Sequence, residues 1–114
     1  MTAASAALGR SGEGRVAEWY VGHGYEVLAR NWRCRTGELD LVVGRARLVV
    51  FCEVKTRTSE RFGAPVEAVT PAKQARIRRL AARWLAEASL PRRAIRFDVA
   101  SVMGGAIEVL EDAF

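Results

Sequence analysis

The stretch LVVFCEVK at residues 48–55 constrains the fold more than any other part of the chain. Its first five residues and Val54 are apolar, and a short run of this kind is typical of a strand buried on both faces of a sheet. Two charged residues, Glu53 and Lys55, stand at its end. Because an unpaired charge is costly in a core, the run predicts a central strand whose charged end has a specific role.

Two further segments show the apolar spacing of helices. Residues 12–23 form the first, which two glycines end, and Glu13 lies on its inward stripe in the first turn. Residues 70–89 form the second, with Thr70 as the N-cap and Pro71 at the first helical position. The opposite face of this second helix is strongly basic.

Alternating residues and turn signals predict four more strands. The three strands from residue 25 to residue 55 are expected to form an antiparallel meander, with a turn at Thr36-Gly37 and a tight connection over residues 44–46. Residues 56–69 are expected to form a long loop, and residues 1–11 a flexible tail. The expected order is αβββαββ, an α/β fold in which a helix packs on a mixed sheet, within one domain spanning residues 1–114. The predicted strands cover residues 25–33, 38–43, 48–55, 95–99 and 107–109.

The basic balance of the chain favours a polyanionic partner only weakly. The net charge is +5 and the pI is about 10.0. However, 16 of the 18 basic residues are arginine, which points to a coding bias, and the two lysines are Lys55 and Lys73. The two cysteines, Cys34 and Cys52, are too few for a disulfide framework, and no secretory or membrane segment is apparent. We therefore expect a cytoplasmic protein with reduced thiols and no membrane partner.

Two acidic clusters on neighbouring strands predict a metal site. Asp40 and Glu53 flank one hairpin and can approach each other, and Lys55 shares a face with Glu53. Carboxylates in one small site repel, and a hard cation such as Mg²⁺ relieves that repulsion. Glu13 could reach the same point and help to hold a second metal. Each triplet alone is commonplace on solvated strands, where an ion pair contributes little, but both together on adjacent strands favour chemistry.

At these residues the chain resembles the YraN-type family of predicted endonucleases, which belongs to the restriction-endonuclease-like superfamily and is similar to archaeal Holliday junction resolvases. The resemblance runs from GRSGEGRVAEWYVGHGYEVLARNWRCRTGELDLV through LVVFCEVKTR, FGAPVEAVTPAKQARI and RFDVASV to the terminal DAF. It implies a restriction-endonuclease-like core, a mixed β-sheet with flanking helices. It also implies an endodeoxyribonuclease that uses Mg²⁺ (or Mn²⁺).

The resemblance assigns the acidic residue and the Glu-x-Lys of the metal motif to Asp40, Glu53 and Lys55, and the early helix Glu to Glu13. Glu38 and Gln74 are possible accessory residues. Basic residues expected to contact DNA are Arg33, Arg35, Arg57, Lys73 and Arg76.

Three functions remain open on the sequence alone. The first is a metal-dependent endonuclease acting on structured or branched DNA, in recombination or repair. The second is a non-catalytic DNA-binding or adaptor protein that keeps the nuclease fold, and the third is a purely structural assembly that binds no metal. A homodimer suits a two-fold substrate, and a monomer is equally compatible.

Overall fold

A computed structural model describes residues 11–57, 69–91 and 93–114 of the chain. The predicted tail, apart from Ser11, and the predicted loop over residues 58–68 lie outside the described residues. The described elements follow the expected order αβββαββ. They are α2 (Gly12–Gly22), β1 (Glu26–Cys34), β2 (Gly37–Arg45), β3 (Leu48–Arg57), α3 (Pro71–Ala88), β4 (Ala94–Met103) and β5 (Ala106–Leu110).

The five strands form one mixed sheet in the order β1-β2-β3-β4-β5. Strands β1 to β3 form the predicted antiparallel meander, and β5 is antiparallel to β4. Strand β3 lies at the centre and runs parallel to β4, which is possible because α3 carries the chain back across the sheet between them. The central position predicted for residues 48–55 is confirmed, as is a mixed sheet with flanking helices, consistent with a restriction-endonuclease-like core.

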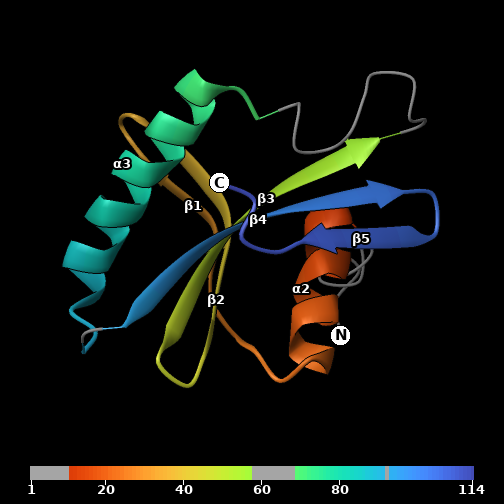
Figure 1. Cartoon of the computed structure of the whole chain (residues 1–114), viewed down its shortest axis with the longest axis horizontal. Coiled ribbons are helices and arrows are strands. Elements are labelled where there is room, and N and C mark those ends of the chain that lie inside the picture. Colours follow the sequence, from red (N-terminus) through yellow and green to blue (C-terminus); the bar gives the residue numbers. More distant parts are fainter. Residues whose placement is uncertain (1–10, 58–68, 92) are drawn as a thin grey trace, which may run out of the picture.

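The two helices cover opposite faces of the sheet (Figure 1). Val49 and Phe51 of β3 pack in the core on the α3 side, whereas Val50 and Cys52 pack in the core on the α2 side. This two-sided burial explains why the run is apolar at every position rather than at alternate ones. Both predicted helices are present among the described residues, one on each face of the sheet. Neither described helix combines the length and apolar character needed to cross a membrane.

The helix starts form as the sequence predicts, and both carry charged residues in their first turn. In α2 the Ser11 Oγ accepts a hydrogen bond from the Gly14 N–H at 3.1 Å. In α3 the Thr70 Oγ1 accepts one from the Lys73 N–H at 3.2 Å, with Pro71 directly after the cap. These caps satisfy N–H groups that have no partner within the helix, and they fix the positions of the first-turn side chains.

Several predicted boundaries are wrong by one to four residues, the most for β4, which continues to Met103 instead of ending at residue 99. Strand β3 continues through Arg57 instead of ending at Lys55, because Thr56 and Arg57 still pair with β4. The β2–β3 turn lies at residues 46–47, one residue beyond the prediction, because Gly44 pairs with strands on both sides. Ala46 takes the left-handed conformation there, with φ of 52°. An alanine does not predict such a conformation, because a side chain disfavours positive φ.

Asp98 is fully buried, because residues 97–102 of β4 are covered on both faces. The Tyr20 hydroxyl donates to its carboxylate at 2.6 Å, and the Arg96 guanidinium donates at 2.8 and 2.9 Å. The Asp112 N–H adds a fourth hydrogen bond at 3.0 Å. This network joins α2, β4 and the C-terminal segment, and it satisfies a charge that would otherwise be costly to bury. Asp98 is therefore a structural residue beneath α2.

Candidate metal centre

Strands β2 and β3 stop pairing at the point where the acidic residues begin. Their register runs from Arg45↔Leu48 to Leu41↔Cys52 and does not continue to residues 40 and 53. There the Asp40 Oδ2 accepts a hydrogen bond from the Val54 N–H at 2.9 Å. A side-chain carboxylate thus replaces the backbone acceptor that a continuing strand would supply. The split between the strands fixes Asp40 in place and leaves its second oxygen for another partner.

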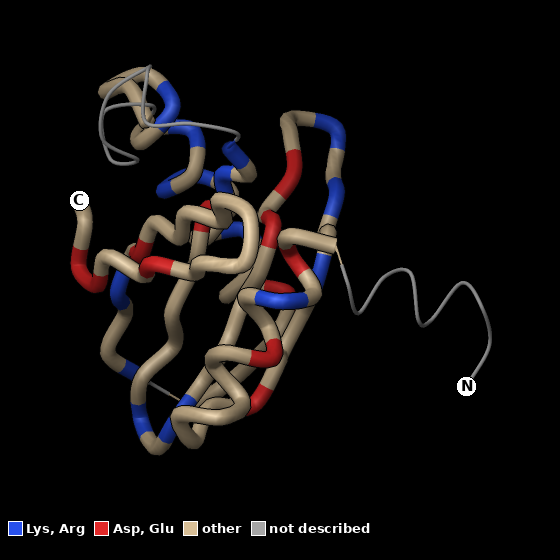
Figure 2. Tube along the Cα trace, turned by 90° about the vertical axis from the view of Figure 1, so that its right-hand side faces the viewer, with Lys and Arg blue, Asp and Glu red and all other residues tan. Residues whose placement is uncertain are grey.

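Three carboxylates from two elements converge at this split. Single ligand oxygens of Glu13, Glu38 and Asp40 all lie within 4.8 Å of one another, and each residue is half-buried. Glu13 comes from the first turn of α2, and the other two come from β2. In Figure 2 several acidic positions lie close together near the start of the described chain, beside a hairpin that also carries basic positions. The predicted approach of Glu13 to Asp40 is therefore seen in the geometry, with Glu38 as the third member.

This crowding changes the titration of Asp40. Burial raises the pKa of its carboxyl to about 6, although the hydrogen bond from Val54 acts in the opposite direction. The charges of Glu53, Glu13 and Glu38 contribute to that rise in the pKa after burial, which is its main cause. A carboxyl whose charge is opposed by burial and by three neighbouring acids is stabilised by a cation at the same point.

Glu53 lies next to this group but faces two lysines. Its Oε1 is 2.9 Å from the Lys73 Nζ and 3.4 Å from the Lys55 Nζ. The Glu53 side chain is only 11% exposed, compared with 25% for each lysine. The structure therefore brings the predicted pair Glu53 and Lys55 together on one face, and it adds Lys73 from the first turn of α3.

The two lysines affect each other's titration. Burial lowers the pKa of Lys55, and the neighbouring charge of Lys73 acts in the same direction. Burial also opposes the charge of Lys73, but its contact with Glu53 and the charge of Asp40 outweigh that effect and raise its pKa. Of the two amines, Lys73 is thus the one that keeps its proton more firmly.

The donor set fits a hard divalent cation. All the converging ligands are carboxylate oxygens, which suit Mg²⁺ and Mn²⁺, and no thiol or imidazole lies in the group among the described residues. Asp40, Glu13 and Glu38 would hold such an ion, with Glu53 beside them. An acidic group that can bind a metal is therefore present where the sequence predicted one.

The remaining predicted residues have varied positions. The Gln74 Nε2 donates to the Val69 carbonyl at 3.0 Å, which ties the start of α3 to the preceding residue. The Arg33 Nε donates to the Glu38 Oε2 at 3.1 Å. Arg35 and Arg76 are exposed, and Arg57 is half-buried at the end of β3. Their contacts with DNA stay predictions.

The contact of Lys73 with Glu53 is the part of the site that sequence reasoning missed. Helical spacing placed Lys73 on a solvated basic face with the arginines of α3, and nothing local linked that face to β3. One signal was present, namely the scarcity of lysine. A chain that uses arginine for 16 of its 18 basic residues places both of its lysines at a single carboxylate.

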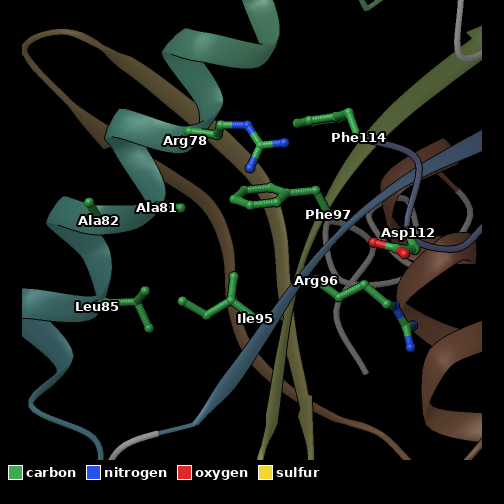
Figure 3. A pocket seen from close by; sticks show the side chains of 9 residues that line it. All are labelled: Arg78, Ala81, Ala82, Leu85, Ile95, Arg96, Phe97, Asp112 and Phe114. Carbon is green, nitrogen blue, oxygen red and sulfur yellow. The ribbon is translucent and has the colours of Figure 1, made fainter.

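A separate concavity lies away from the acidic group. A cavity of about 450 Å³ opens between α3, β4 and the C-terminal residues, as Figure 3 shows. Its lining is largely apolar, and the Arg78 guanidinium lies 4.8 Å from the centre of the Phe97 ring. None of the site carboxylates lines this cavity. The candidate site is therefore assigned by its converging charged groups and not by the size of a hollow.

Comparison with known proteins places the chain in a family. Residues 12–102 match the family described as "Uncharacterised protein family UPF0102", a range that contains every carboxylate and lysine discussed above. A UPF0102 protein of Frankia casuarinae is 58% identical over 93 residues, which cover 82% of this chain and 79% of the relative. One of Mycolicibacterium vanbaalenii is 49% identical over 110 residues, covering 96% and 91%. One of Beutenbergia cavernae is 54% identical over 97 residues, covering 85% and 82%. The chain therefore belongs to UPF0102, the YraN-type family.

Proposed function

We propose that this protein is an endonuclease that hydrolyses phosphodiester bonds in DNA with Mg²⁺ or Mn²⁺. The observation that carries the proposal is the convergence of Glu13, Glu38 and Asp40 at the split between β2 and β3. Glu53 neighbours this group, and Lys55 lies on the same face as Glu53, 3.4 Å from its Oε1. Converging carboxylates with an adjacent lysine suit phosphoryl chemistry, because they combine a cation site with a positive charge for the phosphate.

Each residue has a definite task in this proposal. Asp40, Glu13 and Glu38 would hold the ion, with the neighbouring Glu53 as a further ligand, and the ion would supply Lewis acidity and an activated water. The Lys55 amine faces the scissile phosphate and stabilises the charge that develops on its oxygens. The single histidine, His23, lies at the opposite end of α2 from Glu13. The leaving oxygen therefore takes its proton from solvent.

The substrate class follows from charge and resemblance. Arg35, between β1 and β2, and Arg76, on α3, are both exposed. The whole chain has a net charge of +5. Such side chains bind phosphates without reading sequence. The resemblance to junction resolvases extends the proposal to structured or branched DNA in recombination or repair.

A cleavage assay with separate binding measurements tests the proposal. Purified protein is incubated with labelled junction, flap and single-stranded DNA in EDTA, Mg²⁺ or Mn²⁺. Asp40→Ala, Glu53→Ala and Lys55→Ala are each expected to abolish metal-dependent cleavage while DNA affinity is largely kept. Glu18→Ala, an exposed change on α2 outside the acidic group, is the matched control and should cleave normally.

The same assay separates the competing functions. A wild-type protein that binds DNA but cleaves none of the substrates with either metal would support the non-catalytic DNA-binding or adaptor function. Cleavage that survives in all three variants would place the chemistry elsewhere.

A further inference from the structure

Both lysines of the chain contact the same carboxylate oxygen, and they do so from different elements. Lys55 is two residues from Glu53 on β3, so the strand itself holds the two on one face. Lys73 comes from the first turn of α3 and makes the shorter contact, 2.9 Å against 3.4 Å. The Glu53 carboxylate, 11% exposed, is therefore already neutralised by side chains of the protein.

This arrangement conflicts with metal binding unless one lysine can leave. A divalent ion that uses the Glu53 carboxylate would lie close to two like-charged groups, and like charges at such distances repel. Lys55 is constrained by its strand position. Both lysine side chains are 25% exposed, but Lys73 reaches Glu53 from a separate element, α3, whose neighbouring face is open to solvent. Lys73 is thus the group that can turn away.

We propose that Lys73 is a positioning residue of the metal site, which holds Glu53 in the metal-free protein, releases it to the divalent ion and then binds a DNA phosphate. Metal and DNA binding are coupled through this exchange. The inference rests on the proposed function, because it takes the acidic group as the metal site and DNA as the ligand.

The other basic residues of α3 do not share this position. Arg76 lies one turn further along, is exposed, and makes no ion pair among the residues described. The ion pair of Arg83 with Glu87, at 3.7 Å, lies within the helix and is exposed. Arg76→Gln therefore removes the same charge from the same helix without touching Glu53, and it serves as the matched control.

The first experiment measures Mn²⁺ affinity without DNA, by calorimetry, in wild type, Lys73→Gln, Lys73→Arg and Arg76→Gln. Removing the competing ammonium is expected to tighten Mn²⁺ binding roughly threefold to tenfold in Lys73→Gln, the range set by one partly exposed ion pair. Lys73→Arg keeps a cation beside Glu53 and should bind like wild type. Arg76→Gln should change the affinity less than about twofold, as a distant screened charge does. Circular dichroism checks that each variant is folded.

The second experiment measures the coupling with DNA by fluorescence anisotropy, using Ca²⁺ to avoid cleavage. In wild type, saturating Ca²⁺ should increase DNA affinity relative to EDTA. In Lys73→Gln the ratio of the DNA affinity in Ca²⁺ to the DNA affinity in EDTA should fall. In Arg76→Gln the DNA affinity should weaken in both conditions, and the ratio should stay as in wild type.

These measurements distinguish a wrong role for Lys73 from a wrong metal site. If wild type binds Mn²⁺ but Lys73→Gln matches Arg76→Gln in both measurements, the role of Lys73 is wrong and the proposed function stands. If wild type and every variant bind no Mn²⁺, the proposed metal site itself is wrong.

Discussion

The Asp40 carboxylate accepts the backbone N–H of Val54 at 2.9 Å, across the gap where β2 and β3 part. This single hydrogen bond closes the end of the strand pair and holds an acid at its tip. The carboxylate is thereby aimed at Glu13 and Glu38 rather than at solvent. The Asp40 carboxylate that closes the end of the strand pair is thus also a candidate metal ligand.

The first prediction concerns the stability of the metal-free protein. Because folding raises the pKa of Asp40 from 3.8 to about 6, the protonated form is favoured in the folded state. The protonated Asp40 carboxyl makes its full contribution to the free energy of unfolding below about pH 4. This contribution is lost as the pH rises through about 6. Asp40→Asn keeps an acceptor for Val54 without the charge. It is expected to be more stable than wild type by about 1 to 2 kcal/mol at pH 7.5, a value reduced for solvent screening, with no gain at pH 4.

Urea unfolding in EDTA across this pH range measures the difference. Asp40→Ala is the control, because it removes both the charge and the acceptor and leaves the Val54 N–H without its partner. It should therefore gain less than Asp40→Asn at every pH. An equal gain at pH 4 and pH 7.5 would contradict the electrostatic cause.

The second prediction concerns the other two members of the acidic group. Glu13→Gln and Glu38→Gln each remove one of three oxygens that lie within 4.8 Å of one another. Each change is expected to weaken Mn²⁺ binding about tenfold or more, since a hard ion depends on charged oxygen ligands. The rise in melting temperature with Mn²⁺ reports the affinity. Glu18→Gln, one turn along α2 from Glu13 and exposed, should behave like wild type. If Glu13→Gln also behaves like wild type, α2 supplies no ligand.

Sequence periodicity predicted most of the fold, because each helix and strand has a local residue pattern of its own. The apolar run of β3, the Thr70-Pro71 helix start and the alternation of the hairpin strands all depend on short-range physics. Asp40 was expected near Glu53 because the two flank a single hairpin, whereas the carboxylate oxygens that converge with Asp40 are those of Glu13 and Glu38.

The missed features depend on contacts between distant segments. Lys73 reaches Glu53 only because α3 crosses over β3, and Asp98 is buried only because Tyr20 and Arg96 are placed to receive it. Such partners are separated by up to 78 positions, and no periodic pattern encodes them. The turn at Ala46 was misplaced for another reason, since its residue type gives no sign of a positive φ.

The third prediction concerns the buried network around Asp98. Burial raises the pKa of the Tyr20 hydroxyl, which keeps it a hydrogen-bond donor to the Asp98 carboxylate at 2.6 Å. Tyr20→Phe is expected to cost about 1.5 to 3 kcal/mol, and Asp98→Ala about 3 to 5 kcal/mol because Arg96 then loses its partner. Denaturant unfolding measures both, with exposed Glu108→Ala as the control. Mn²⁺ affinity should be unchanged in Tyr20→Phe. A tenfold loss of that affinity would mean that the network also positions the site.

The fourth prediction concerns the two free thiols. Burial raises the pKa of Cys52, which is only 2% exposed, whereas the hydrogen bond with Thr36 lowers the pKa of Cys34. The thiolate is the reactive form, so a disulfide reagent at pH 8 should modify Cys34 rapidly and Cys52 only on unfolding. Mass spectrometry counts the modified sites, and Cys34→Ser should remove the fast reaction. Rapid labelling of Cys52 in the native protein would show that the α2 side of the sheet opens.

The fifth prediction concerns the close approach of α2 to β3. A Cβ on Gly12 would clash with the Thr56 Oγ1, so a larger residue there requires either the Thr56 side chain or the first turn of α2 to shift. Gly12→Ala is expected to push that turn away, lower stability by about 1 to 3 kcal/mol and carry Glu13 out of the acidic group, which weakens Mn²⁺ binding. Gly22→Ala, at the other end of the helix, meets nothing within 4 Å and should be neutral or slightly stabilising. If Gly12→Ala loses stability but keeps wild-type Mn²⁺ affinity, the position of α2 does not control the site. If Gly12→Ser and Gly12→Ala lose Mn²⁺ affinity while Gly22→Ala does not, the metal centre depends on the close approach of Gly12 to the Thr56 side chain.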